Sequence, residues 1–245
     1  MGAGRRGTVK RGGALALPGL AAFCFSTMAH AATVVIQNNT IISNGTGDGS
    51  AVVEGNGTIA TEARPMGVVT EARIDGAFDV TITVENDASL VLEADENILP
   101  LIKTETSGTL LRIFPDGSFS TRNPVKVVLS LPRLFVLTSA GSSTIVASGF
   151  DQERLDVVLT GSSQVRLAGK VQNFAATLSG SGNLNAEPLD ADSASIDISG
   201  SGRCSITVRH RLVADISGSG VVAAHGNPRQ RNTHVSGSGR VDFVR

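Results

Sequence analysis

The second half of this chain repeats a short glycine-serine corner at nearly constant spacing. The tripeptide Gly-Ser-Gly or Gly-Ser-Ser recurs from residue 139 onward at intervals of 18 to 20 residues. Its glycines are Gly141, Gly161, Gly180, Gly200, Gly218 and Gly237, and the serines that follow them are Ser142, Ser162, Ser181, Ser201, Ser219 and Ser238. A period of this length is typical of a solenoid, in which each coil buries its apolar side chains only against its neighbours.

Apolar and polar residues alternate on both sides of each corner. Before the corner lie segments such as Val157-Val158-Leu159 and Ile196-Asp197-Ile198, and after it lie segments such as Gln164-Val165-Arg166-Leu167. Alternation with a period of two indicates β-strands. Because two or three strands fill each coil of about 18–21 residues, no room is left for a helix. The sequence therefore predicts an all-β fold, a parallel β-helix.

Stacking explains why the corners contain glycine and serine. Coils of a β-helix lie about 4.8 Å apart, so each corner residue lies above the same residue of the preceding coil. Glycine permits the positive φ or the close backbone approach that such a corner requires. We expect the serine hydroxyls to form a hydrogen-bonded ladder along the solenoid axis.

The N-terminal half is less regular. Residues 32–57 are rich in Asn and Gly, which predicts a leader or linker. Beyond them the alternation returns in residues 78–84, 90–92 and 125–129, with longer turns between. We expect residues 58–245 to form a single β-helix domain whose N-terminal coils are less regular than the repeats.

Residues 1–31 have the pattern of an export signal peptide. Four basic residues come first, an apolar stretch follows over residues 14–27, and an Ala-His-Ala cleavage sequence ends at Ala31. The apolar stretch is shorter than the roughly twenty residues that span a bilayer, so cleavage is expected and the mature chain is not membrane-spanning. The pair Arg5-Arg6 resembles part of a twin-arginine signal, and ordinary Sec export is equally compatible. The mature chain is predicted to be periplasmic, secreted or displayed at the cell surface.

Loss of the signal changes the charge and the cysteine content. Four basic residues and no acidic ones are removed, which lowers the formal charge from −1 to −5. Nucleic acid is therefore not expected as a partner. Cys24 leaves with the signal, so Cys204 alone remains and no intramolecular disulfide can form. Cys204 occupies an apolar inward position of its strand, which predicts a buried, unreactive thiol.

Three segments ahead of the repeats resemble a known protein family. They are residues 57–64 (GTIATEAR), 78–82 (FDVTI) and 93–102 (EADENILPLI). Together with the Ser-Gly-Ser-Gly coils that follow them, they resemble the putative auto-transporter adhesin, head GIN domain family over roughly residues 55–245. The resemblance implies a β-helical domain of exported bacterial proteins with a suggested adhesive role, and it carries over no catalytic residue.

Asp197, Asp215 and His234 are predicted to share one outward position in three successive coils. Two carboxylates and an imidazole about 5 Å apart have the chemistry to hold a divalent cation or to shift one another's pKa values. The alternative is a solvated polar face, which the nearby Arg203 and Arg240 favour. We adopt the second interpretation and expect no metal, no cofactor and no catalytic residue.

The sequence thus favours an exported, non-catalytic β-helix that acts as a surface or envelope scaffold and binds an unidentified cell-envelope or extracellular ligand. Its exposed terminal coils also offer surfaces for self-association. The alternative is a β-helical enzyme acting on an envelope or plant polysaccharide, which would need paired carboxylates beside a sugar-binding groove. The chain has no Trp and no Tyr, which argues against sugar processing.

The expected cleavage of the signal peptide predicts where the mature chain begins. Amino-terminal sequencing of exported protein should start near Ala32, because the cleavage sequence ends at Ala31. Recovery of chains that begin with Met1 from a soluble cytoplasmic fraction would contradict both the cleavage and the export.

Overall fold

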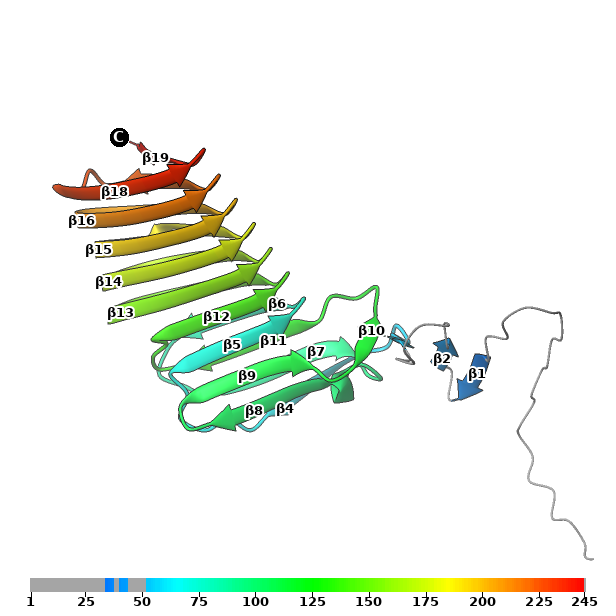
Figure 1. Ribbon diagram of the computed structural model, residues 1–245. Coiled ribbons are helices and arrows are strands. Elements are labelled where there is room, and N and C mark those ends of the chain that lie inside the picture. The colour runs from blue at the N-terminus through cyan, green and yellow to red at the C-terminus, as the bar shows by residue number, and fades with distance from the viewer. Residues whose placement is uncertain (1–33, 38–39, 44–51, 245) are drawn as a thin grey trace, which may run out of the picture.

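The computed structural model describes residues 34–37, 40–43 and 52–244 (Figure 1). The predicted signal, residues 1–31, lies outside the described residues, as do residues 32–33, 38–39 and 44–51 of the predicted leader. The regular structure of the described chain consists of β-strands and one 3-10 helix, η1 (Leu99–Leu101). In this part of the chain, no helix has the length and apolar character needed to cross a membrane. Strands β1 (Val34–Gln37) and β2 (Thr40–Ser43) form an antiparallel pair.

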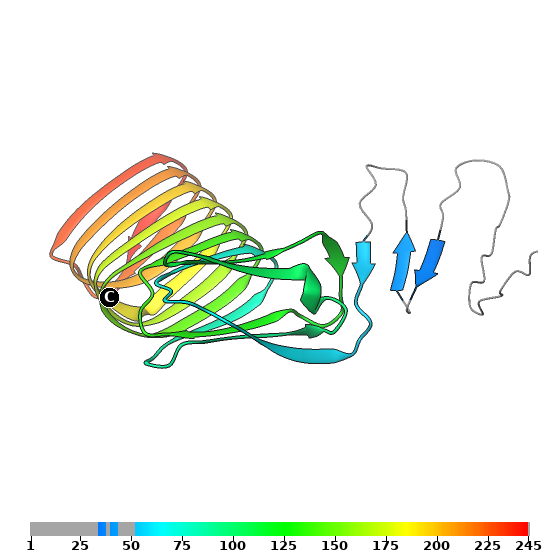
Figure 2. The same ribbon diagram turned by 90° about the horizontal axis from the view of Figure 1, so that it is seen from below.

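The C-terminal half is a parallel β-solenoid of about five turns, which confirms the predicted fold class. Its strands are β12 (Val136–Gly141), β13 (Thr144–Gly161), β14 (Gln164–Gly180), β15 (Asn183–Gly200), β16 (Arg203–Gly218), β17 (Val221–His225), β18 (Gln230–Gly237) and β19 (Arg240–Phe243). Strands β13 to β16 are long and bent, so that one strand with its corner makes a whole coil. In Figure 2 these strands follow nearly the same curved path, one above another.

Inward-facing residues of successive coils stack into apolar columns. Leu155, Phe174, Ala194 and Leu212 are register partners in β13, β14, β15 and β16, and each is at most 4% exposed. A single coil has no interior of its own, so this burial exists only between coils. The alternation seen in the sequence is therefore the alternation between the solenoid interior and its surface.

The N-terminal half does not follow the solenoid axis in chain order. Strands β5 (Glu71–Gly76) and β6 (Asp79–Val84) form one coil, and the coil of β12 and β13 stacks directly on it. On its other side this coil pairs with β9 (Leu110–Pro115) and β11 (Lys126–Leu131), which come later in the sequence. After β6, the chain therefore first forms β9 and β11 on one side of the β5–β6 coil. It then forms β12 and β13 on the opposite side.

Antiparallel strands cover the end of the solenoid beyond this layer. Strand β7 (Ser89–Asp95) pairs with β11 and with β4 (Ile59–Arg64), and β8 (Ile102–Ser107) pairs with β9. Figure 1 shows them below the stack of coils. The sequence indicated strands here but not their direction, because alternation on a half-buried strand is the same in parallel and antiparallel pairs.

The family-like segment around residue 95 fixes the chain where it enters the domain. The Asn97 side chain donates to the Glu54 carbonyl at 2.8 Å and accepts a hydrogen bond from the Asn56 backbone amide at 3.0 Å. Beside it, Asp95 is 1% exposed and accepts a hydrogen bond of 2.6 Å from the Thr121 hydroxyl. These contacts attach the entering segment to the antiparallel end of the solenoid, alongside the pairing of β3 (Val52–Glu54) with β10 (Ser118–Ser120).

The corner glycines adopt a backbone conformation that other residues rarely reach. All six predicted corner glycines have φ between +106° and +125°. Gly76, with φ +133°, is the register partner of Gly141 and extends the column by one coil. A Cβ placed on Gly200 would lie 2.6 Å from the carbonyl oxygen of Gly180. Close stacking of the backbone thus excludes a side chain at this corner, in addition to the strain of a positive φ.

The serines that follow the corner glycines do not form the expected hydroxyl ladder. Their side chains are exposed, and within residues 52–244 no hydrogen bond joins one of these hydroxyls to the next. In the first five corners it is the serine backbone amide that donates to the glycine carbonyl of the coil below, for example from Ser201 to Gly180 at 2.9 Å. That prediction was wrong because backbone groups already fill the stacking direction, which leaves the hydroxyls facing water.

The residue after the serine is buried at the first five corners, and two of them show that it is small enough to fit the side chain of the coil below. Ser163 is buried, and its hydroxyl lies 2.8 Å from the hydroxyl of Ser139. Gly220 holds the same place two coils beyond Gly182, and a Cβ there would lie 2.6 Å from Cγ2 of Ile198. The choice between Gly-Ser-Ser and Gly-Ser-Gly is therefore a packing choice.

Replacing Gly200 with Ala tests whether stacking, rather than φ alone, requires glycine. Gly57 is the matched control, because its φ is +80° and no atom lies within 4 Å of an added Cβ. Gly57→Ala should cost about 1–2 kcal/mol of stability from backbone strain. Gly200→Ala should cost a further ~1–3 kcal/mol because the Cβ overlaps the Gly180 backbone, and Gly200→Val should cost more. Urea unfolding measures all three losses, and equal losses at the two alanine positions would contradict the stacking explanation.

Candidate functional site

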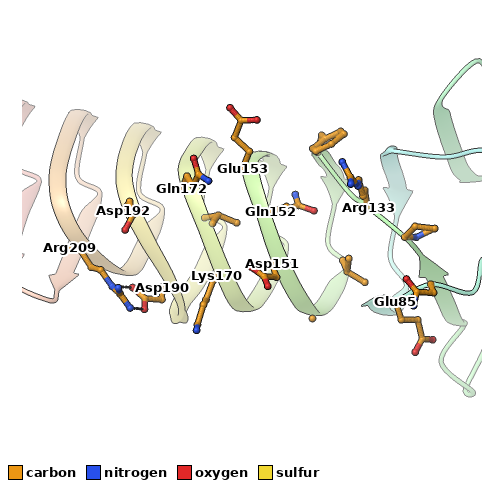
Figure 3. A pocket seen from close by; sticks show the side chains of 16 residues that line it. Glu85, Arg133, Asp151, Gln152, Glu153, Lys170, Gln172, Asp190, Asp192 and Arg209 are labelled. Atoms are coloured by element: carbon orange, nitrogen blue, oxygen red, sulfur yellow. Dashed lines mark hydrogen bonds and ion pairs between the residues drawn. The ribbon is translucent and has the colours of Figure 1, made fainter.

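A groove of about 840 Å³ runs along the side of the solenoid, at the bend within each long strand (Figure 3). It crosses several successive coils, from the end of β6 to β16. Its charged lining residues are Glu85, Arg133, Asp151, Glu153, Lys170, Asp190, Asp192 and Arg209. The groove therefore presents both signs of charge along a path roughly parallel to the solenoid axis.

Shifts in strand register create the bend. The pairing of β13 with β14 shifts between Ala147 and Phe150, and a similar shift follows Arg166 in the next pair. Gly149 lies in this bend with φ +86°, and a Cβ there would lie 2.6 Å from the carbonyl oxygen of Val84. Such β-bulges turn a strand and redirect its side chains. Here they direct the residues after the bend toward the groove.

Charges of opposite sign alternate from coil to coil along the groove. Asp151 is the register partner of Lys170, and Lys170 is the partner of Asp190. Arg209 of the next coil donates from Nε to Asp190 Oδ1 at 2.6 Å, and its Nη2 bonds the other oxygen. This hydrogen-bonded pair raises the pKa of Arg209 above its ordinary value. The dashed lines in Figure 3 mark this pair, whose opposite charges neutralise each other.

The other charged side chains of the groove make fewer contacts with residues of opposite charge. Within residues 52–244, neither Lys170 nor Arg133 makes an ion pair. Asp192 lies 3.7 Å from Nδ1 of His210, and both side chains are about half exposed, at 48% and 61%. Lys170 lies between Asp151 and the Asp190 pair along the axis (Figure 3). Its ammonium and the Arg133 guanidinium are thus available to a ligand.

Part of the groove wall is apolar. Phe135, Val171, Pro132 and Val84 line it together with the charged residues. Gln152 is held in place, because its side-chain amide donates to the Leu134 carbonyl at 2.5 Å. The groove can therefore offer hydrogen bonds, charges of both signs and an aromatic ring to a bound molecule.

Sequence reasoning did not single out these groove residues, although a signal for them exists. Asp151, Lys170 and Asp190 each lie ten residues before a corner glycine, and Arg209 lies nine before Gly218. The residues therefore occupy equivalent places in successive repeats. The bend itself gives no clear sequence signal, so the concave surface becomes visible only in the folded chain.

The predicted polar stripe exists, but its surroundings are ordinary surface. Asp215 is the register partner of Asp197 and of His234, so the three side chains lie on adjoining coils. All three are exposed. Across the described residues, no group of three His, Cys, Asp or Glu side chains is arranged to hold a metal ion. The stripe is not part of the groove lining.

Cys204 lies at its expected inward position. It is 2% exposed and free, with Leu184 and Val222 as its register partners on either side. Burial raises the pKa of its thiol to about 12. The thiolate, which is the reactive form, is therefore not populated near neutral pH in the folded chain.

The fold and groove define a parallel β-solenoid with a charged lateral groove and an antiparallel N-terminal end. Residues 69–228 match the family described as "Putative auto-transporter adhesin, head GIN domain". The chain belongs to this family, as the resemblance of its sequence indicated. No curated protein matches the chain.

Solved structures share the fold. A putative adhesin from Bacteroides fragilis NCTC 9343 is 18% identical, with a TM-score of 0.62, and the match covers 78% of this chain and 99% of that one. A putative lipid binding protein from Parabacteroides distasonis ATCC 8503 is 22% identical, with a TM-score of 0.54 and the same coverage. At such identities the likeness establishes the common architecture.

Replacing Asp215 with Asn tests the stripe. Like charges on neighbouring strands repel mildly, and exposed substitutions change stability by no more than roughly 0.5 kcal/mol. We therefore expect the melting temperature of Asp215→Asn to be unchanged or slightly raised. A marked fall that a chelator reproduces in the wild type would instead show that Asp197, Asp215 and His234 hold a metal.

Proposed function

We propose that this protein is an exported, non-catalytic binding module of the cell surface or envelope, and that its ligand lies in the lateral groove. The observation that carries the proposal is the groove itself, which crosses successive coils and contains charged side chains, such as Lys170 and Arg133, that make no ion pair within residues 52–244. A concave surface with a few convergent polar groups is the usual form of a binding site. The family description of an adhesin supports a surface binding role.

The repeat of the groove favours an extended polar polymer as ligand. Coils recur about every 4.8 Å, and the alternation of Asp151, Lys170 and Asp190 offers acceptors and donors in turn along the axis. Lys170 and Arg133 can bind carboxylates or hydroxyls, whereas Asp151 and Glu153 can bind hydroxyls or amines. A glycan chain of the envelope or extracellular matrix fits this mixed lining, with Phe135 as its apolar contact.

An apolar ligand fits the groove less well. One structural neighbour carries the description of a lipid binding protein, and a lipid acyl chain needs a continuous apolar channel. Here charged side chains from each coil interrupt the apolar wall of Val84, Pro132, Phe135 and Val171. Burying these charges against hydrocarbon would be costly, so a polar ligand is favoured.

The alternative of a polysaccharide enzyme has less support. Glycoside hydrolysis requires a pair of free carboxyl groups on either side of the bond that is cleaved. Two of the groove carboxylates are engaged, because Asp190 is bound by Arg209 and Asp192 lies beside His210. Asp151 and Glu153 make no ion pair within residues 52–244, so the case against an enzyme depends on the comparisons. The family and the Bacteroides fragilis neighbour are described as putative adhesins, the other reported neighbour is described as a putative lipid binding protein, and none of these descriptions names an enzyme. We therefore assign the groove to binding.

A charge reversal in the groove tests the proposal. Lys170→Glu and Arg166→Glu make the same reversal of charge on the same strand, β14, but of the two residues Lys170 alone lines the groove. Binding would be measured on a printed array of bacterial and host glycans and on phosphatidylcholine vesicles. We expect glycan binding by the wild type, at least a tenfold loss for Lys170→Glu, and near wild-type binding for Arg166→Glu.

Other outcomes of the same experiment are equally informative. Equal losses for the two variants would remove the groove from binding. Binding to vesicles alone would replace the glycan with a lipid. Release of new reducing ends from a bound glycan, abolished by Glu153→Gln, would replace the binding module with an enzyme.

A further inference from the structure

The last described coil breaks the apolar column that runs through the solenoid. Leu212 is fully buried, and its register partner on β18 is Arg231. In the three preceding coils this inward position holds Leu155, Phe174 and Ala194, which are also buried. A charged residue thus stands where every earlier coil of the column has an apolar one.

Arg231 lies across the end of the core. Its guanidinium carbon is 4.1 Å from the centre of the Phe243 ring, on β19, the next strand along the chain. Its Nε donates to the Pro228 carbonyl at 3.0 Å, and its Nη2 donates to the side chain of Asn227. Asn227 is the one non-glycine residue with positive φ in the described chain. The guanidinium therefore joins the turn before β18 to the aromatic ring of β19.

Arg231 lies beside an exposed surface that can attract another β-strand. All eight residues of β18 are exposed, and β18 pairs only with β16 among the described strands. Val235 and Phe243, at the inward positions above Ile216 and Ala224, are 38% and 36% exposed. An uncovered strand edge next to apolar side chains is a template for edge-to-edge pairing.

We propose that Arg231 prevents the C-terminal coil from pairing with the same end of a second copy, and that this surface associates once the charge is removed. This inference does not depend on the ligand of the groove. Inward-pointing charged residues are a known protection of strand edges. Pairing of two such ends would bury both guanidiniums against apolar side chains, which is costly because neither would have a carboxylate partner.

A comparison of the two ends of the solenoid indicates that the partner would be the same end of a second copy. At the other end, antiparallel strands cover the core, and the edge strand β4 carries the ion pair of Glu62 with Arg64. The described chain therefore offers uncovered apolar inward positions only at the β18–β19 end. Once Arg231 is replaced, two of these ends can bury Val235 and Phe243 together, related by a twofold axis.

Arg231→Leu is the direct test, with Arg229→Leu as its control. Arg229 is exposed and lies in the turn of the same coil, so the control makes the same chemical change away from the core. Light scattering after size exclusion, over a hundredfold range of concentration, should show monomers for the wild type and for Arg229→Leu. Arg231→Leu should double its molar mass as concentration rises. A monomeric, folded Arg231→Leu would overturn the proposal.

Two further variants locate the surface and guard against misfolding. Val235→Lys in the Arg231→Leu background restores an inward charge and should return the protein to a monomer. Arg231→Gln removes the charge but keeps a long polar side chain, and it should associate more weakly than Arg231→Leu. Circular dichroism checks the fold of each variant. If Arg231→Leu is unfolded, a folded but strictly monomeric Arg231→Gln overturns the proposal, as does a ladder of species larger than the dimer.

Discussion

The structure depends on backbone hydrogen bonding between coils that are stacked in register. Each coil has no interior of its own, so its stability comes from the coils above and below it. The spacing of these coils is set by the backbone, and it leaves no space for a side chain at the corner, where Gly200 follows Gly180. Glycine is therefore required there by distance as well as by φ, and the period of the sequence is the length of one coil.

A stack of coils has two ends, where the apolar core and the strand edges must be covered, and a lateral surface that faces solvent. The N-terminal end is closed by strands that run against the solenoid direction, with the Asp95 segment holding the entering chain. At the C-terminal end, Arg231 lies over Leu212 and against Phe243. On the side, β-bulges turn each strand and leave a hollow. This hollow is concave and charged, and it is where we propose that the ligand lies.

Most of the solenoid followed from the sequence. The corner spacing and the period-two alternation predicted the parallel β-helix, the strands around each corner and the burial of Cys204. The stacking of Asp197, Asp215 and His234 also follows from spacing, because residues at equal distances from equivalent corners meet in register. The prediction of a hydroxyl ladder was wrong. The spacing places the serines above one another, but it does not determine whether their hydroxyls or their backbone amides form hydrogen bonds along the axis.

What the sequence alone determined is therefore the repeating unit and its family, because periodicity and corner chemistry are local properties of the chain. Only the tertiary structure decided the order of layers in the N-terminal half, where β9 and β11 lie beneath the earlier β5 and β6. It also decided the groove, since register shifts after Ala147 and Arg166 bring separated side chains onto one concave face. Both features depend on pairing between distant segments, and strand alternation carries no information about which partner a strand will choose.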